Sequence, residues 1–540
     1  MRNVYLGSVV LLLGAVAVAG SASCSTDAED VGSLEPTDGG GGETSSEGGA
    51  CAAKETDCSG KCVDVASDRL NCGGCGISCS AGSECCASRC VETAACTFAV
   101  TGTSPAGGWQ NGGDWVTLSG TGFVKGMKVY LGDGRAPVLV VDSTNARILT
   151  PPGPLGPVDV RVESGGKTAV LKSAFSYAEG GLAGPWAQKP MSKVRGEDPG
   201  VAVMQDGRVL VAGGTTVPDK TDFALDTAEI YTRATDKVTP ASNAMGTARW
   251  QNSAVTLLDG RVLVVGGACL QGLTGCKAGS DAKKADLYDP TTNNFAPTKS
   301  DLTVPRVYTH AVLLVDGRVL ISSSNDDSLD LFDPETETFE KLTHTPRHVF
   351  GFMVRLRDGR VMLGAGDGGT KDVELFDSDS KTFKPADPLK QGRSKLTAHV
   401  LPDGRVLVIG GASVSAGGIN VPLDSIEAFD PKTETWSTMP YKMSKGRCWH
   451  ASALVRDGTI LSMGGYTLTG SCDSLDDTVD QIDPVKGTVT TFAKLPNKNT
   501  EWQAVTLLDG SVLGVGGGAC GPTGSALPDL DFLPGKDGPK

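Results

Sequence analysis

The sequence predicts an all-β protein whose largest part is a seven-bladed β-propeller, preceded by a smaller β-sandwich and a disulfide-rich module. The propeller is predicted by a recurring unit in which an Asp-Gly pair separates two apolar runs. Successive pairs lie 42 to 57 residues apart, a period typical of radial repeat folds. The seven pairs begin at Asp206, Asp259, Asp316, Asp358, Asp403, Asp457 and Asp509.

Each unit predicts four antiparallel strands. In the second unit, residues 253–258 and 262–265 flank Asp259-Gly260. We expect a two-residue type I′ hairpin there, which requires positive φ at both central positions. Both runs are apolar almost throughout, so we expect both faces of the strands to be buried. A third β-rich run, an Asp-Pro turn and a large apolar residue follow, as in residues 285–295, which gives four strands.

The seventh unit lacks its fourth strand. It contains a first hairpin, residues 504–517, and a third strand at residues 530–534, and the sequence ends at Lys540. A segment before the first unit, Trp186–Arg195, is similar to Trp436–Arg447, which holds a fourth strand and the residues after it. We therefore expect the Trp186 segment to supply the outer strand of the last blade, which removes an exposed sheet edge.

A Gly-Gly pair, an aromatic residue and a second large aromatic residue recur at fixed spacing, as in Gly410-Gly411, Phe429 and Trp436. This pattern resembles the kelch-repeat family, which is related in fold to the central domain of galactose oxidase. The resemblance covers about residues 184–540 and implies a kelch-type propeller over that range.

The N-terminus predicts export. Residues 1–23 carry one charge, at Arg2, and an apolar stretch from Val9 to Ala19, followed by small residues before Cys24. This resembles a bacterial lipoprotein signal, which implies that Cys24 is acylated; simple secretion is the alternative. Ser25 after the cysteine implies sorting to the outer membrane rather than retention in the inner membrane.

Residues 24–50 are expected to form a flexible tether. Seven acidic residues and no lysine or arginine fall between residues 25 and 50, which accounts for half of the chain's net charge of −14. Such a composition cannot bury a core. The acidic balance of the chain also argues against nucleic-acid binding.

Residues 51–96 contain ten cysteines and no histidine. In an exported chain this density predicts a disulfide-stabilised module. Zinc is the alternative, because Cys72 and Cys75 have a suitable spacing. The runs Cys58-Ser-Gly-Lys-Cys62 and Asn71-Cys-Gly-Gly-Cys75 resemble the Stig1-like repeat, which is frequent in envelope proteins of myxobacteria.

Residues 97–177 predict a separate β-sandwich, because short β-rich runs such as residues 116–123, 129–132 and 158–162 alternate with turns. Together with the final Phe175-Ser-Tyr177, these runs resemble the IPT/TIG immunoglobulin-like domain. The resemblance implies a spacer or adhesion module, joined by a short linker to the propeller at residue 184.

The loops of one propeller face hold the candidate binding residues. An arginine lies near the entry to six blades, and an aromatic residue follows several of them. One interpretation is structural, with each arginine paired inside the fold; the other is a funnel of guanidinium groups and aromatic rings for an anionic or glycan ligand. The funnel candidates are Arg249, Trp250, Arg306, Tyr308, Arg347, Arg393, Arg447, Trp449 and Trp502.

The five propeller cysteines map to the same face by topology. We expect Cys269–Cys276 and Cys448–Cys472 to form disulfides, which leaves Cys520. Three histidines close to first strands, His310, His399 and His450, are expected to be packing residues. His344 and His348 are expected to be solvated loop residues.

The resemblance to galactose oxidase raises the possibility of a copper-radical oxidase. That chemistry uses two histidines and two tyrosines, one of them cross-linked to a cysteine. Residues 306–310 and 448–450 match it only loosely. We therefore expect a monomeric, non-enzymatic lipoprotein of the outer membrane, facing the periplasm or the cell surface. It would bind a glycan or protein ligand without a metal or cofactor. The alternatives are the oxidase and a purely structural surface component.

Overall fold

The computed structural model describes residues 56–63, 65, 68–86, 89–92, 98–196, 198–216, 224–267, 283–323, 326–343, 348, 350–414, 420–468, 474–518 and 529–536. Within these ranges the protein is built from β-strands, with a short 3₁₀ turn at Asp367–Gly369. None of the described helices has the length and apolar character needed to span a membrane. The predicted signal peptide, Cys24 and the tether lie outside the described residues.

The cysteine-rich module consists of two small hairpins joined by disulfides. Its strands are β1 (Thr56–Asp57), β2 (Cys62–Val63), β3 (Ser83–Cys86) and β4 (Arg89–Glu92), which pair as β1–β2 and β3–β4. The predicted disulfide chemistry is confirmed, because bridges join Cys58 to Cys75, Cys72 to Cys85 and Cys79 to Cys90. Both cysteines of the Cys72-x-x-Cys75 pair, which suggested zinc, are therefore bonded in disulfides.

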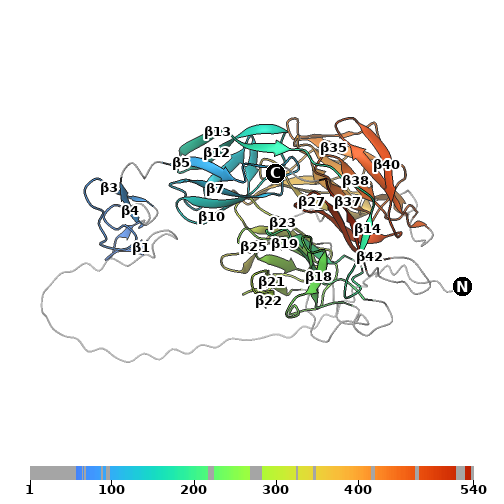
Figure 1. The fold of residues 1–540 in the computed structure, drawn as a ribbon, viewed down its shortest axis with the longest axis horizontal. Helices are drawn as coiled ribbons and strands as arrows, with labels where there is room; N and C mark the ends of the chain where they lie inside the picture. Colours follow the sequence, from blue (N-terminus) through green and yellow to red (C-terminus); the bar gives the residue numbers. More distant parts are fainter. Residues whose placement is uncertain are drawn as a thin grey trace, which may run out of the picture. The chain divides into compact units, whose positions relative to one another are not determined.

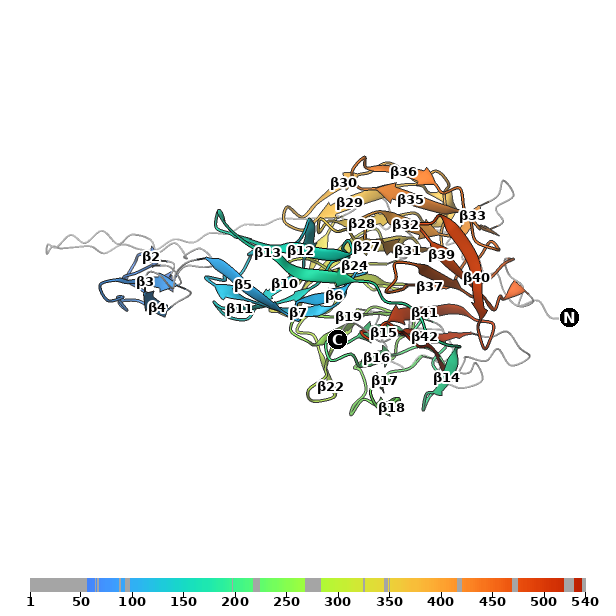
Figure 2. The ribbon, with the colours of Figure 1, turned by 45° about the horizontal axis from the view of Figure 1, so that its top comes forward.

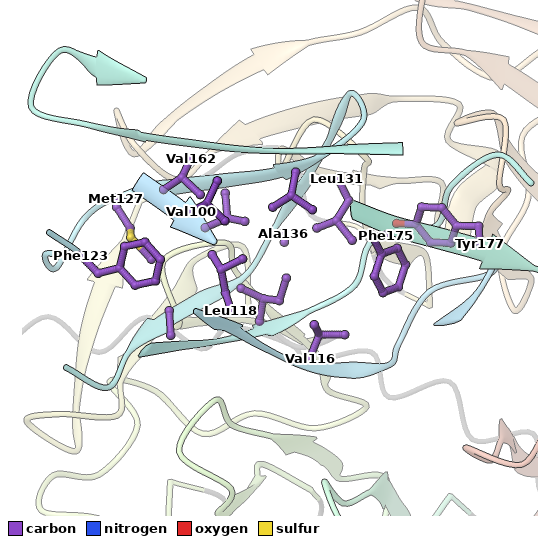
Figure 3. Close-up of a cluster of buried hydrophobic side chains, with 14 residues drawn as sticks. Val100, Val116, Leu118, Phe123, Met127, Leu131, Ala136, Val162, Phe175 and Tyr177 are labelled. Atoms are coloured by element: carbon purple, nitrogen blue, oxygen red, sulfur yellow. The ribbon is translucent and has the colours of Figure 1, made fainter. Parts of the chain in front are cut away.

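The next unit is a β-sandwich of two sheets, ordered β10-β11-β7-β5 and β6-β13-β12-β8-β9. Along β7, buried residues alternate with more exposed ones, as one buried sheet face requires. The core between the sheets includes Phe175 and Tyr177, whose rings meet edge to face at 5.1 Å (Figure 3). The strands are β5 (Ala99–Ser104), β6 (Gly107–Trp109), β7 (Trp115–Thr121), β8 (Lys128–Leu131), β9 (Gly134–Ala136), β10 (Val138–Val140), β11 (Asn145–Leu149), β12 (Gly156–Ser164) and β13 (Lys167–Ala178).

The predicted seven-bladed propeller is confirmed as seven four-stranded antiparallel sheets (Figure 2). Blades one to three are β15 (Gly200–Val203), β16 (Val209–Ala212), β17 (Ala228–Thr232) and β18 (Lys237–Pro240); β19 (Ser253–Thr256), β20 (Val262–Val265), β21 (Ala285–Asp289) and β22 (Asn294–Pro297); and β23 (His310–Leu313), β24 (Val319–Ser322), β25 (Leu329–Asp333) and β26 (Thr338–Leu342).

Blades four to six follow the same order. They are β27 (Phe352–Arg355), β28 (Val361–Gly364), β29 (Val373–Asp377) and β30 (Thr382–Pro385); β31 (Thr397–Val400), β32 (Val406–Ile409), β35 (Ile426–Asp430) and β36 (Thr435–Thr438); and β37 (Ala451–Leu454), β38 (Ile460–Met463), β39 (Thr478–Asp483) and β40 (Thr488–Lys494). A small hairpin, β33 (Ala412–Val414) and β34 (Asn420–Pro422), extends the fifth blade.

The seventh blade closes the ring with strands from both ends of the repeat region. β41 (Thr500–Thr506), β42 (Val512–Gly518) and β43 (Asp529–Leu533) are completed by β14 (Ala187–Pro190). β14 pairs antiparallel with β43, with Gln188 opposite Asp531, and Figure 1 shows β14 in green beside the red strands of this blade. Trp186 packs against the core between the sixth and seventh blades. The predicted closure is therefore confirmed.

The Asp-Gly hairpins differ from the predicted type I′ turn. All seven glycines have positive φ, between 82° and 101°, but none of the seven aspartates does. In the first blade the Gly207 N–H donates to Met204 O (3.0 Å), and the Met204 N–H donates to Arg208 O (2.8 Å). This is a longer loop, with a type I turn followed by a left-handed glycine. The aspartate stabilises it by accepting the N–H two residues further on, as from Arg208 to Asp206 (3.0 Å).

The β-sandwich contacts the ends of the propeller strands that carry these hairpins. Arg456, which is 2% exposed, donates to Asn111 Oδ1 (2.8 Å) and Gly112 O (2.7 Å), and burial lowers its pKa to about 10. Further hydrogen bonds join Trp109 Nε1 to Leu508 O, the Arg135 N–H to Arg357 O and the Val138 N–H to Val315 O. These contacts reach four different blades, so this end of the channel faces the sandwich.

The ring closure can be tested by cross-linking. Gln188 and Asp531 are 343 residues apart in sequence but directly opposite in the β14–β43 pair. A Gln188→Cys/Asp531→Cys variant should form an intramolecular disulfide on mild oxidation, because the Cα atoms of opposed strand residues lie within bridging range. Mass spectrometry of a non-reduced digest would detect it. A Gln188→Cys/Thr435→Cys control should stay reduced, and a thiol pair that stays reduced at 188 and 531 would contradict the closure.

Candidate functional site

Five arginines that precede the first strand of a blade are buried and paired with a carboxylate. Each carboxylate lies on the third strand of the same blade, at its second position in four blades and at its third position in the sixth blade. In the third blade, Arg306 Nε lies 2.6 Å from Asp330 Oδ2, and both side chains are 0% exposed. The other pairs are Arg195–Glu229 (3.1 Å), Arg249–Asp286 (2.6 Å), Arg393–Glu427 (2.7 Å) and Arg447–Asp480 (3.0 Å).

The same guanidinium groups also satisfy backbone carbonyls where the second strand ends. Arg249 Nη1, for example, donates to Gly266 O (2.9 Å) and Lys284 O (2.8 Å). A buried charge is stable only when it is paired and hydrogen-bonded, and these contacts supply both conditions. The funnel assignment of Arg249, Arg306, Arg393 and Arg447 is therefore wrong, because their charges are cancelled inside the blades. Arg347 lies outside the described residues.

In the fourth blade His348 stands where the other blades place arginine. Its Nδ1 lies 2.9 Å from Ala365 O, the counterpart of the glycine carbonyls, and its Nε2 lies 3.6 Å from Glu374 Oε2. The side chain is 8% exposed, so the expectation of a solvated loop histidine is also wrong. In the seventh blade Asn499 takes the position and donates to Gly516 O (3.1 Å).

Shortly after each of these positions, one residue per blade adopts a left-handed backbone conformation. The seven φ values lie between 41° and 58°, at Asp198, Gln251, Tyr308, Phe350, Lys395, Trp449 and Glu501. Left-handed non-glycine residues cost free energy and persist only where the surrounding structure fixes them. We call these seven residues the mouth ring.

Backbone hydrogen bonds connect the mouth ring from blade to blade. At five of the seven junctions between blades, the N–H of one ring residue donates to the carbonyl of the ring residue before it. The bonds run from Gln251 to Asp198 (2.9 Å), Lys395 to Phe350 (2.8 Å), Trp449 to Lys395 (3.2 Å), Glu501 to Trp449 (3.1 Å) and Asp198 to Glu501 (3.0 Å). The repeated geometry fixes seven side chains around one opening, which we call the mouth.

The mouth leads into a cavity of about 370 Å³ that all seven blades line. One sector is aromatic: the Tyr308 and Phe350 rings lie 4.6 Å apart, and Trp449 lies 5.1 Å from Phe350 and 5.8 Å from Tyr308. The Lys395 ammonium lies 5.5 Å from both the Phe350 and the Trp449 rings, within cation–π range. The opposite sector is polar, with Glu501, Asp198 and Gln251 on consecutive blades.

Histidines lie deeper in the same cavity. His399 Nε2 lies 2.6 Å from Ser452 Oγ, and His450 Nε2 lies 3.1 Å from Thr397 Oγ1, so each imidazole bonds a hydroxyl of the neighbouring blade. Burial lowers the pKa of His399 to about 4 and that of His450 to about 3. Both are therefore neutral near pH 7, in keeping with the packing role predicted for them.

The structure brings two of the predicted aromatic residues, Tyr308 and Trp449, to the mouth, whereas Trp502 borders the cavity but packs in the core between the sixth and seventh blades. Trp250 instead packs against Ala224 and Ala248. The sequence interpretation missed the polar ring residues Asp198, Gln251, Lys395 and Glu501. The available signal was their spacing, since each follows the buried position by two residues, or by three in the case of Asp198.

The cysteine predictions have a mixed outcome. Cys448 is a free, buried thiol, 1% exposed, so the predicted Cys448–Cys472 bridge is wrong. Burial raises its pKa to about 11. Cys472, Cys520 and the predicted pair Cys269–Cys276 lie outside the described residues.

Comparison with known families identifies three regions of the chain. Residues 44–100 match the stigma-specific STIG1-like protein family, residues 99–177 the IPT/TIG domain and residues 394–443 the Kelch motif. These matches agree with the three resemblances in the sequence.

Two curated proteins share the repeat region at low identity. Kelch-like protein 35 of Mus musculus is 28% identical over 265 residues, 47% of this chain, and alpha-scruin of Limulus polyphemus is 22% identical over 231 residues, 40% of this chain. The matches span 41% and 24% of those proteins, respectively, less than half of either.

Among solved structures, a fungal alcohol oxidase of the AA5 family, in complex with copper, superposes with a TM-score of 0.52. The match covers 66% of this chain and 76% of the oxidase at 17% identity. At this identity the likeness supports the propeller fold and carries no information on activity.

Removal of one arginine from a buried pair should lower the stability of the folded protein strongly. Arg306→Ala should lower the free energy of unfolding by about 3 to 5 kcal/mol, because Asp330 would remain buried without its partner. Urea denaturation would measure the loss. Lys384→Ala, which removes an exposed pair with Glu434, should change little. Equal stability of the two variants would show that the buried pair is not required.

Because His399 and His450 are neutral in the folded protein, we expect the protein to lose stability in acid. Their pKa values in the folded state lie below the ordinary 6.5, so the unfolded chain takes up protons first as the pH falls. Stability is therefore complete above about pH 6.5 and decreases toward the folded pKa values of 3 to 4.

Urea denaturation at pH 7 and pH 5 would test this expectation. The loss should be roughly 1 to 2 kcal/mol per imidazole at pH 5. His399→Gln, which can still bond Ser452, should show a smaller decrease than the unmodified protein. Identical decreases in the two proteins would contradict the assignment.

Proposed function

We propose that this protein is a non-enzymatic recognition protein whose propeller binds a glycan or protein ligand at the mouth. The observation that carries the proposal is the cavity of about 370 Å³, lined by aromatic rings on one side and carboxylates on the other. Concave sites of this size with a few polar groups among apolar ones are typical of ligand pockets. In this proposal the charged side chains at the mouth are those of Asp198, Lys395 and Glu501, and not the arginines expected from the sequence.

The proposal includes an exported location. The pattern of residues 1–24 supports a lipoprotein anchored through Cys24 in the outer membrane, facing the periplasm or the cell surface. A single acyl chain binds a membrane only weakly, so stable anchoring would need the several chains of a mature lipoprotein. In this proposal the protein is monomeric, and the cysteine-rich module and the β-sandwich hold the propeller away from the membrane.

The copper-radical oxidase is a weaker candidate, because the residues at the mouth do not fit its metal site. Of the described residues that line the cavity, Tyr308 is the only tyrosine, whereas that chemistry uses two. Cys448 is a free, buried thiol and does not line the cavity. Among the residues placed in the structure, no three His, Cys, Asp or Glu side chains of the mouth bring their ligand atoms within 4.8 Å of one another.

Array binding separates a recognition protein from a purely structural one. The purified protein should bind members of a glycan or peptide array, and Trp449→Ala should weaken binding at least about tenfold by removing an aromatic contact of a central residue. Trp250→Ala is the matched control, since Trp250 does not line the cavity. No binding on either array, or equal binding by both variants, would reject the proposed site. Radical absorption and turnover of alcohols after copper loading would favour the oxidase.

A further inference from the structure

The mouth carries charges of opposite sign on different sides. Of the described residues that line its cavity, Asp198, Lys395 and Glu501 are charged near pH 7. The lining histidines add no charge, because burial lowers the pKa of each one below its ordinary value of 6.5. The two carboxylates enter the first and seventh blades, which are neighbours in the ring, whereas the ammonium enters the fifth. The opening therefore has a negative side and a positive side.

On the positive side, the Lys395 ammonium is held by aromatic rings instead of a carboxylate. It lies 5.5 Å from the rings of both Phe350 and Trp449. Across the described part of the chain, no carboxylate forms an ion pair with it. A cation–π contact positions the charge but uses none of the three N–H donors of the ammonium group. Those donors can form a charge-assisted hydrogen bond with a carboxylate of a ligand.

On the negative side, backbone hydrogen bonds hold two carboxylate residues next to each other. The Asp198 N–H donates to Glu501 O (3.0 Å), and the Glu501 N–H donates to Trp449 O (3.1 Å). Gln503 Nε2 also donates to Asp198 Oδ1 (3.3 Å), which orients that carboxylate. Two adjacent carboxylates at the wall of a cavity attract a cationic group of a ligand.

Trp449 separates the positive side from the negative side. In the mouth ring it follows Lys395 and precedes Glu501, and its indole packs with Tyr308 and Phe350 in the aromatic sector. A ligand that meets both charges must therefore span an aromatic surface. A single amino acid carries its ammonium and carboxylate groups on one carbon, whereas a peptide carries them several bonds apart. A neutral glycan would use neither charge.

We infer that the mouth binds a peptide in which an apolar side chain lies between an ammonium group and a carboxylate. The ammonium group lies toward Asp198 and Glu501, the carboxylate toward Lys395 and the apolar side chain against the aromatic sector. Two sources supply this chemistry: the free ends of a short peptide, and charged side chains in an exposed protein loop. This inference rests on the proposed binding function and narrows its ligand from glycan or protein to a dipolar peptide.

Four forms of one tripeptide test the inference. Glycyl-phenylalanyl-glycine would be titrated into the full-length protein by calorimetry with both ends free, with the amine acetylated, with the carboxyl amidated and with both ends blocked. We expect the form with two charges to bind most tightly. The doubly blocked form should bind at least about tenfold more weakly, because it loses both charge-assisted contacts. A doubly blocked lysyl-phenylalanyl-aspartate peptide tests side chains as the source of the charges.

Two substitutions each remove one charge and keep side-chain bulk. Lys395→Met should weaken binding of the free tripeptide about tenfold and leave binding of the amidated form, which has no carboxylate, unchanged. Glu501→Gln should weaken binding of the free tripeptide and leave binding of the acetylated form unchanged. A merely structural role for either residue would weaken all forms equally. Lys384→Met and Glu434→Gln, which break an exposed pair outside the cavity, are the matched controls and should bind like the unmodified protein.

The outcomes separate this inference from the proposed function. A preference for peptides with both charges, from either source, that each variant reduces only for its own charge supports the inference. Equal binding of the four tripeptide forms overturns it, and so does binding of a singly charged form as tight as that of the free tripeptide. If no peptide binds while a glycan array does, the inference falls and the recognition function stands. If no peptide or glycan binds, both fall.

Discussion

The geometry of the mouth depends on the buried pairing, in five of the blades, of an arginine with a carboxylate on the third strand. In the third blade Arg306 joins Asp330 and, through Nη1, the Ser328 carbonyl (2.7 Å), so that one side chain ties the loop entering the blade to the blade itself. Tyr308 of the mouth ring follows two residues later. Such a pair adds little net stability compared with an apolar core, because desolvation offsets the attraction. We interpret its role as fixing where the ring residue lies.

The sequence predicts the propeller well because the signals are local and repeated. The Asp-Gly period, the apolar runs and the similarity of the Trp186 and Trp436 segments each depend on neighbouring residues, and they suffice for seven blades and the closure by β14. The hairpin type was wrong because Asp-Gly fits both a two-residue turn and a longer loop in which only the glycine has positive φ.

The site was harder to predict, because a sequence does not show which repeated charges are buried. Arginine at a fixed offset in successive blades suits a basic funnel and an internal pair equally well. The deciding signal was the acidic residue at the second or third position of every third strand, as in Glu229 and Asp480. A repeated charge with a repeated opposite charge indicates an internal pair. In the fourth blade the sequence points to Arg347 rather than His348, because the two residues are adjacent and arginine occupies this position in the neighbouring blades.

The repeat separates what the fold needs from what differs between blades. The buried pairs and the left-handed backbone of the mouth ring recur in most or all blades, whereas the ring side chains range from tryptophan to glutamate. The sevenfold geometry requires the buried pairs and the left-handed backbone, whereas the side chains of the mouth ring are free to vary. Since the opposite end of the channel faces the β-sandwich through contacts such as Arg456 with Asn111, a ligand would approach from the mouth. The division of that opening into aromatic and polar sectors is then the first chemistry that a ligand meets.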